Sequence, residues 1–217
     1  PFARVWLHAE HLMVEGQKMA KSLGNFYPVR DLLALGSQPE AIRYLLASVP
    51  YRKKLNFTLE GLKAEATAIE RLRNFQLRLD TGAFSAGLNE AIVLRTGAAL
   101  NQFEEALDDD LNTAEALAAI FEYIREANIA MDAGEFRGGN VEPARDLLAR
   151  FDRIFDVIRP GETQGAVSDE VVEALIAERA AARRARNFAR ADAIRAELLE
   201  KGIVLEDTRE GVRWKRK

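Results

Sequence analysis

Apolar residues recur at helical spacing through the middle of the chain, between positions 58 and 158. In four successive stretches they fall three or four positions apart, the pattern of a helix that buries one face. The pattern breaks at 82–87, 108–112 and 134–140, where glycine, aspartate and asparagine gather. Four amphipathic helices with short connections predict a four-helix bundle. The apolar positions of these helices are Leu62, Ala66, Ile69, Leu72 and Leu79; Ile92, Ala99, Leu100, Phe103 and Leu107; Leu117, Ile120, Phe121, Ile124 and Met131; and Val141, Ala144, Leu147, Leu148, Phe151, Ile154, Phe155 and Ile158.

Shorter elements are expected before the bundle. An apolar segment and a short strand end near Val14, and two short helices follow at 29–35 and 39–49. Pro39 suits the first turn of the second helix, where its missing N–H has no partner to lose. Residues 50–57 are expected to form an extended connection with basic and aromatic residues, suited equally to an RNA backbone and to a plain surface linker.

A second, smaller domain is expected after the bundle. The residues at 160–167 are rich in glycine and include a proline, so they predict a linker and a domain boundary. The elements expected beyond it are helices at 168–187 and 188–201 and strands at 203–206 and 212–215. Asp207 is expected in the turn between the strands. The predicted fold class is therefore mainly α, with a small C-terminal α/β module.

Composition narrows the possible functions. The chain has 217 residues, of which 48% are hydrophobic and 30% charged, enough to build a sizeable core. It contains no cysteine, which excludes disulfides and thiolate metal sites within it. No apolar run approaches the roughly 20 residues of a membrane span, so a soluble, cytoplasmic protein is expected. The net charge of −3 does not indicate nucleic-acid binding, but local patches can matter more than the sum.

A basic loop at 15–25 has the sequence Glu-Gly-Gln-Lys-Met-Ala-Lys-Ser-Leu-Gly-Asn. Its flanking glycines predict a loop between two ordered elements. Lys18 and Lys21 stand three positions apart, and a lysine ammonium on a flexible stem suits a phosphate that moves during a reaction. A solvated basic turn is the commoner explanation for a lone pair of lysines.

Two candidate metal sites are weak. His8 and His11 have no third ligand nearby in the sequence. The consecutive aspartates at 108–110 point in different directions, whereas a metal ion needs convergent oxygens. Asn112 and Glu115 instead predict a capping box that begins the third long helix. No metal site is predicted in this chain.

Arginines gather in the terminal module, where Phe188 stands among them. Guanidinium groups bind phosphates and stack on bases, and an exposed aromatic ring can stack an unpaired base. Carboxylates at Asp192 and Asp207 could accept hydrogen bonds from base amino groups. An equally favoured alternative places Phe188 in the small core and the arginines in water. The arginines are Arg179, Arg183, Arg184, Arg186, Arg190 and Arg195.

The strings along the chain resemble those of the cysteinyl-tRNA synthetase family of class I. The loop at 15–25 resembles the KMSKS signature of class I synthetases, with Ala20 in place of its middle serine. Strings from both ends of the chain are also similar to that family, and the terminal ones are the most telling. These strings lie at 1–8, 41–46, 55–57, 108–117, 188–195, 202–208 and 211–214.

The resemblance implies a ligase that activates cysteine with ATP and transfers it to tRNA(Cys). It implies that Lys18 and Lys21 are catalytic and bind the ATP phosphates, on a loop expected to be mobile. Residues 1–57 would end the catalytic domain with a stem-contact segment, and 58–159 would form an anticodon-binding-type bundle that contacts the tRNA. Residues 168–217 would recognise the GCA anticodon.

The anticodon contacts that the resemblance implies fall at Arg183, Phe188, Asp192 and Asp207. Phe188 stands where some members have tryptophan, so stacking is expected from a smaller ring. The family's His-Ile-Gly-His motif and zinc site lie upstream, and the chain begins at Pro1 without methionine. A C-terminal fragment that makes no cysteinyl-adenylate alone is therefore expected. The alternatives are a stand-alone tRNA-binding or regulatory module and a paralogous cysteine ligase that uses a small amino-sugar acceptor.

Overall fold

The structure is a computed structural model that describes residues 2–159, 169–185, 187–208 and 211–216. The chain divides into two compact units, with the break after Arg159. The predicted linker at 160–167 lies outside the described residues, and so does position 168, where the next helix is predicted to begin. No helix of the described part is long and apolar enough to cross a membrane.

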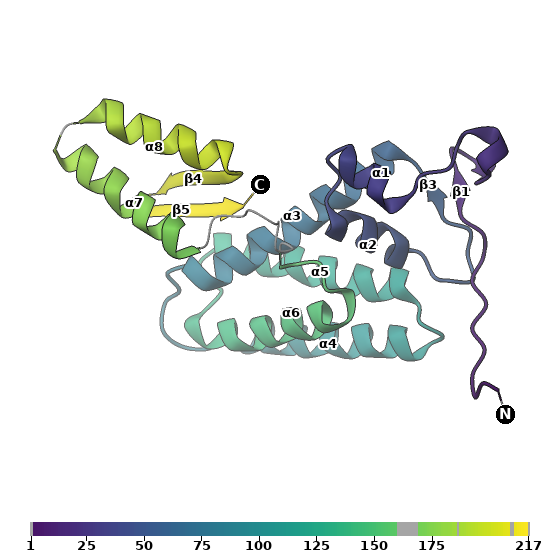
Figure 1. The fold of residues 1–217 in the computed structure, drawn as a ribbon. Coiled ribbons are helices and arrows are strands. Elements are labelled where there is room, and N and C mark those ends of the chain that lie inside the picture. Colours follow the sequence, from purple (N-terminus) through teal and green to yellow (C-terminus); the bar gives the residue numbers. More distant parts are fainter. Residues whose placement is uncertain (1, 160–168, 186, 209–210, 217) are drawn as a thin grey trace. The chain divides into compact units, whose positions relative to one another are not determined.

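Four long helices form the body of the first unit (Figure 1). They are α3 (Leu59–Thr81), α4 (Glu90–Asp108), α5 (Thr113–Asp132) and α6 (Val141–Phe155). Their apolar stripes meet in one core, as the periodicity predicts. At its centre the rings of Phe151 and Phe155 stack with centroids 4.7 Å apart, and Phe103 packs on both at 6.1 and 6.5 Å. The four-helix prediction is confirmed.

Side-chain caps fix where three of the long helices begin. The side chain of Thr58 accepts a hydrogen bond from the backbone of α3, and that of Asn89 does the same for α4. At α5, Asn112 accepts from the Glu115 N–H and donates to the Glu115 carboxylate at 2.9 Å. The capping-box prediction at Asn112 is therefore confirmed.

Helix α6 ends at Phe155, three residues earlier than the apolar pattern predicts. Asp156 adopts a left-handed conformation with φ of 52°. The Asp152 carboxylate accepts hydrogen bonds from the backbone N–H groups of residues 157 and 158, at 2.8 Å each. Arg73 donates to the carbonyls of residues 157 and 158, and Arg43 to those of residues 154 and 155. Two guanidinium groups thus satisfy the carbonyls at the end of this helix.

The segment before the bundle contains two short helices and a small sheet. The helices are α1 (Val29–Ala34) and α2 (Pro39–Ser48), which confirms both predictions within a residue. The sheet has the order β2-β1-β3, formed by β2 (Gln17–Lys18), β1 (Met13–Val14) and β3 (Asn56–Phe57). Strand β1 is antiparallel to β2 and parallel to β3. The connection predicted at 50–57 therefore ends in a strand that supports the lysine loop.

The turn between α4 and α5 docks on that same connection. Asp110 and Leu111 both have positive φ, 55° and 56°, which is uncommon for residues other than glycine. The Asp110 carboxylate accepts hydrogen bonds from the Tyr51 hydroxyl at 2.6 Å and from the Arg52 guanidinium. The contact with Arg52 lowers the pKa of Asp110 below its usual range, so the carboxylate stays ionised.

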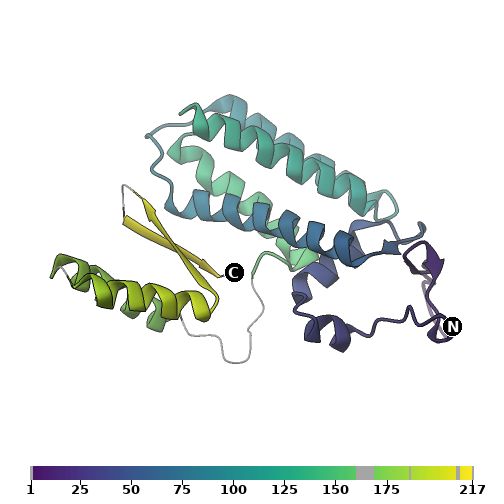
Figure 2. The same ribbon diagram turned by 90° about the horizontal axis from the view of Figure 1, so that it is seen from above.

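The second unit is a helical hairpin packed on a two-stranded sheet (Figure 2). It contains α7 (Asp169–Arg184), α8 (Phe188–Glu200), β4 (Ile203–Thr208) and β5 (Gly211–Arg216). The strands are longer than predicted, so Asp207 lies inside β4, paired with Val212, and not in the turn. Its core is formed by Val172, Ile194, Leu198, Ile203 and Leu205. The predicted fold class, mainly α with a small α/β module, is confirmed.

Candidate functional site

The lysine loop begins as a tight hairpin between β1 and β2. Its two turn residues, Glu15 and Gly16, both have positive φ, 49° and 76°, as a type I′ turn requires. The Gly16 N–H donates to the Asn56 side-chain oxygen at 2.7 Å, which ties the turn to β3. Lys18 ends the hairpin in β2. The predicted loop is therefore a supported hairpin for its first half.

The side chain of Asn25 closes the second half of the loop. Its oxygen accepts from the Ala20 N–H at 2.8 Å, and its amide donates to the Lys18 carbonyl at 3.2 Å. Between these contacts the chain makes one 3₁₀ turn, Lys21–Leu23, which ends at Gly24 in the left-handed region, φ 68°. One amide group thus fixes the backbone on which both lysines stand.

Both lysine side chains are exposed, and neither makes an ion pair within the described part of the chain. The Lys21 ammonium lies over the ring of Phe26, 5.4 Å from its centroid, a weak cation–π contact that leaves the charge open to solvent. Met19, between them, is half-buried and packs on the core. Because Met19 packs inward and both lysines face outward, this small, anchored loop presents two positive charges to solvent.

Phe188 lies at the first position of α8 and is 60% exposed. The core of the second unit is complete without it, so the alternative that places Phe188 in that core is wrong. Asn187 caps the helix by accepting from the Arg190 N–H at 3.1 Å. The cap holds the ring-bearing residue at the helical hairpin's tip.

Three of the four expected anticodon residues, Arg183, Phe188 and Asp192, lie near the turn between α7 and α8. Arg183 stands in the last turn of α7 and Phe188 at the first position of α8, so both lie at the tip of the helical hairpin. Asp192 follows one helical turn after Phe188 and is exposed. Asp207 is placed by its backbone near the end of β4, and its side chain lies outside the described part.

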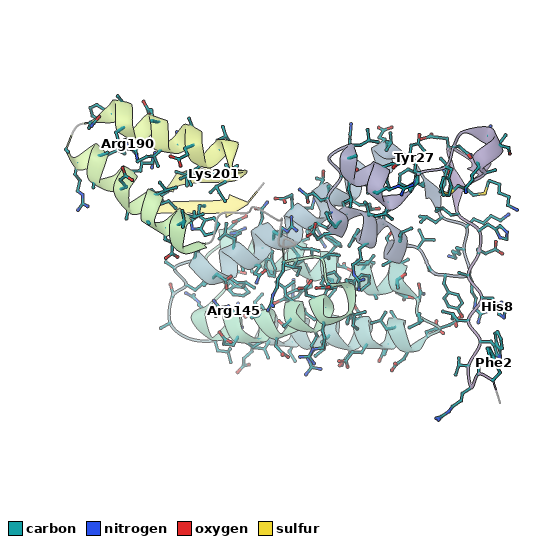
Figure 3. All side chains as sticks on the ribbon, viewed as in Figure 1. Phe2, His8, Tyr27, Arg145, Arg190 and Lys201 are labelled. Carbon is teal, nitrogen blue, oxygen red and sulfur yellow. The ribbon has the colours of Figure 1, made fainter. Side chains whose placement is uncertain are left out.

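The predicted crowd of exposed arginines needs correction. Arg179 is only 5% exposed, because it stands on the face of α7 that holds Val172 and packs inward. Arg190 is exposed but bonds the carboxylate of Glu178 in α7 at 2.7 and 2.9 Å (Figure 3). Arg186 lies outside the described residues.

The candidate metal ligands do not come together. His8 lies on the extended N-terminal segment near Phe2, with its ring stacked 6.3 Å from that of Trp6 (Figure 3). Over the described residues, no three carboxylate or histidine side chains are arranged to hold a metal ion. With no cysteine in the sequence either, the donors present do not fit the zinc site that the family resemblance implies.

Sequence reasoning missed the roles of two residues that hold the loop, Asn25 within it and Asn56 in β3. The Gly-Asn pair after the second lysine was a signal for Asn25, because asparagine side chains often bond to nearby backbone groups. Asn56 had no local signal, since its partner Gly16 stands 40 residues away.

Three protein-family models match successive parts of the chain. A tRNA synthetases class I (C) catalytic domain matches residues 1–67, a DALR domain matches 102–158, and a cysteinyl-tRNA ligase anticodon binding domain matches 168–214. The chain belongs to the cysteinyl-tRNA ligase family. The catalytic-domain match includes the lysine hairpin, and the last match includes Phe188 and Asp192.

Relatives of this ligase family align with the whole chain. Cysteine–tRNA ligases of Solibacter usitatus, Koribacter versatilis and Leptospira interrogans are 62%, 49% and 41% identical to it. Each alignment covers 100% of this chain but only 46%, 49% and 46% of the relative. The chain therefore spans about half the length of the relatives it matches.

A solved structure shows a similar fold at low identity. A chain in the crystal structure of the ternary complex of Agrobacterium radiobacter K84 agnB2 LeuRS with tRNA and LeuAMS superposes with a TM-score of 0.52 and 19% identity. The match covers 68% of this chain and 21% of the other. It supports the fold of this ligase-family chain and no more.

Proposed function

We propose that this chain supplies the ATP-contacting lysine loop and the tRNA-binding parts of a cysteine–tRNA ligase. The observation that supports the second role most directly is Phe188, a large aromatic side chain that is 60% exposed. Burial of such a ring against a base is worth on the order of 1–3 kcal/mol, which explains why an aromatic residue in water would be useful there.

The chemistry of the loop fits the phosphates of ATP. In adenylate formation, cysteine's carboxylate attacks the α-phosphorus and pyrophosphate leaves, so negative charge develops on the leaving group. Two ammonium groups without ion pairs can stabilise that charge in the transition state. Lys18 and Lys21 take this role. Asn25 acts as a positioning residue, because it holds the backbone of both lysine-bearing segments.

The proposal assigns a separate role to each of three successive parts of the chain. Residues 1–57 would contribute the loop and a stem-contact segment, 58–159 a tRNA-binding bundle and 168–217 the anticodon-recognition module. Arg183, Phe188, Asp192 and Asp207 would contact the anticodon. The ring would stack a base, the carboxylates would accept from base amino groups, and the guanidinium would bind the backbone.

Binding of tRNA(Cys) transcripts tests the module. We expect the wild-type chain to bind a transcript with GCA more tightly than one with a changed anticodon, and salt to weaken both. Phe188→Ala should weaken binding of the GCA transcript about 5- to 150-fold, the factor that corresponds to losing one stacked base. Phe188→Leu keeps an apolar side chain of similar size and should lose most of the same affinity.

Lys21→Ala is the matched control, since it removes a charge in the other unit. It should leave the tRNA affinity of this chain unchanged within about twofold, because Lys21 belongs to the other compact unit and a single exposed charge adds little. Equal affinity of the wild-type chain for both anticodons would contradict the assignment of the module.

Catalysis by the chain alone is not expected. Cysteine-dependent exchange between ATP and pyrophosphate needs a site that selects cysteine, and the donors here do not fit the family's zinc site. We therefore expect no such exchange from these 217 residues. Exchange above the level of a Lys18→Ala, Lys21→Ala double variant would refute this.

A further inference from the structure

One exposed face of α8 holds a third side chain that no role above includes. Phe188, Asp192 and Arg195 are spaced by four and then three residues, so they project from the same side of the helix. All three are exposed. The buried residues of α8 are a different set, Ala191, Ile194 and Leu198. Arg195 therefore extends the proposed base-binding surface by one helical turn.

The two charged side chains of this face are not engaged with protein. Within the described part of the chain, neither Asp192 nor Arg195 makes an ion pair or a hydrogen bond, with each other or with any neighbour. Residues three apart on a helix commonly pair when their charges are opposite. By contrast, Arg190 on the same helix is held by Glu178. A carboxylate and a guanidinium thus stand side by side, both available to a ligand.

Building on the proposed function, we propose that Arg195 is a further specificity-determining residue that reads guanine together with Asp192. Guanine presents two acceptors, O6 and N7, next to two donors, N1–H and the 2-amino group. A guanidinium donates bidentately to O6 and N7, the commonest specific contact to this base. A carboxylate accepts from N1–H and the 2-amino group. The base stacks on Phe188, and these two edges face along α8 toward Arg195 and Asp192.

The order of donors and acceptors on Arg195 and Asp192 disfavours adenine, cytosine and a phosphate as ligands. Adenine carries an amino group where guanine has O6, so the guanidinium would meet another donor. Cytosine offers the carboxylate a single amino group. The Cβ atoms of residues three apart on a helix are roughly 5–6 Å from each other, so a phosphate on Arg195 would be repelled by the neighbouring Asp192 carboxylate. Guanine alone among the bases offers two hydrogen-bonding partners to each side chain, and it brings no second negative charge.

The test uses the full chain and RNA stem-loops with the tRNA(Cys) anticodon arm. In two further stem-loops the anticodon guanine is replaced by 7-deazaguanine, which lacks only N7, or by inosine, which lacks the 2-amino group. Arg195→Gln should weaken binding of the guanine stem-loop roughly 10-fold. It should have a smaller effect, roughly threefold or less, with 7-deazaguanine, where one of the two acceptors is already missing, and keep its full effect with inosine.

Two matched variants separate charge from geometry. Arg195→Lys keeps the charge but loses the planar fork, so it should still lose most of the discrimination between guanine and 7-deazaguanine. Arg190→Gln removes the same charge from the flank that faces α7, and it should weaken all three RNAs equally. Thermal denaturation checks that the exposed Arg195 variants remain folded.

Other results would overturn the proposal in distinguishable ways. An equal loss with all three RNAs, together with a salt dependence that falls by about 0.7 in log–log slope, would make Arg195 a phosphate contact. Unchanged affinity of Arg195→Gln for the guanine stem-loop would remove it from the interface. If the wild-type chain does not distinguish GCA from a changed anticodon, the proposed function fails along with it. If the wild-type chain distinguishes them and Arg195→Gln does so equally well, only the role of Arg195 fails.

Discussion

Replacing Asn25 should open the lysine loop without unfolding the unit that bears it. The Asn25→Ala variant loses two hydrogen bonds, to the Ala20 N–H at 2.8 Å and the Lys18 carbonyl at 3.2 Å. A net contribution of 0.5–1.5 kcal/mol each gives a local cost of about 1–3 kcal/mol. Part of that is recovered because water reaches this half-buried site, so about 1–2 kcal/mol is the working value.

Hydrogen exchange of the Ala20 amide measures this cost directly. If exchange proceeds through local opening, 1–2 kcal/mol corresponds to a rate roughly 5- to 30-fold faster in Asn25→Ala. The Met13 amide, which bonds the Leu55 carbonyl at 2.8 Å beside the hairpin, should keep its rate. It reports whether the small sheet is intact.

Asn25→Asp separates the two contacts. Aspartate keeps an oxygen for the Ala20 N–H, but it has no N–H for the Lys18 carbonyl. The Ala20 amide should therefore remain protected in this variant. An Ala20 amide that exchanges equally fast in the wild type and in Asn25→Ala would refute the claim that this side chain closes the loop.

Three further outcomes follow from burial and charge. Phe188→Ala should change the free energy of unfolding by less than about 0.5 kcal/mol in urea titration, because the side chain is 60% exposed; a larger loss would place the ring in the core. Phe151→Ala should cost about 3–5 kcal/mol in the same assay, since this ring is 0% exposed; a loss under 1 kcal/mol would contradict the aromatic core. The contact between Asp110 and Arg52 lowers the pKa of the carboxylate, so its stabilising effect is present above the usual value near 4 and is lost as the pH falls below it. Asp110→Asn should abolish that acid transition of the α4–α5 turn, followed by NMR; an unchanged transition would assign it to another group.

The long helices and the terminal hairpin were predictable from sequence because each repeats its signal many times. Helices α3 to α6 give between four and six turns of apolar spacing, and α3, α4 and α5 begin directly after Thr58, Asn89 and Asn112, residues that favour caps. The buried positions of α8 follow the same rule. Such elements are decided by local periodicity, which a single sequence displays.

The small sheet around the lysine loop was not predictable in the same way. Strands of two residues give no alternation to detect, and β1 pairs with β3, more than 40 positions away. Asp110 and Leu111 adopt left-handed conformations because Tyr51 and Arg52 hold the aspartate, a contact across 58 positions or more. No local propensity would place a leucine there.

The site residues also differ in whether a local pattern in the sequence reveals them. Lys18 and Lys21 were found because their string is continuous in sequence. The inward position of Arg179 and the outward one of Phe188 depend on which faces of two helices meet. An arginine at helical spacing with apolar residues can pack its aliphatic stem inward, and charge alone does not reveal this.

The arginine contacts after α6 set a practical limit on where this polypeptide can be cut. Val157 and Ile158 are buried, and their carbonyls are acceptors for Arg73, whose side chain is only 15% exposed. A truncation after the last helical residue, Phe155, would remove both carbonyl acceptors of the Arg73 guanidinium. It would also remove two apolar side chains from the core. A shortened protein that ends at Arg159 keeps them all, so the anchoring tail belongs with the helices and not with whatever follows.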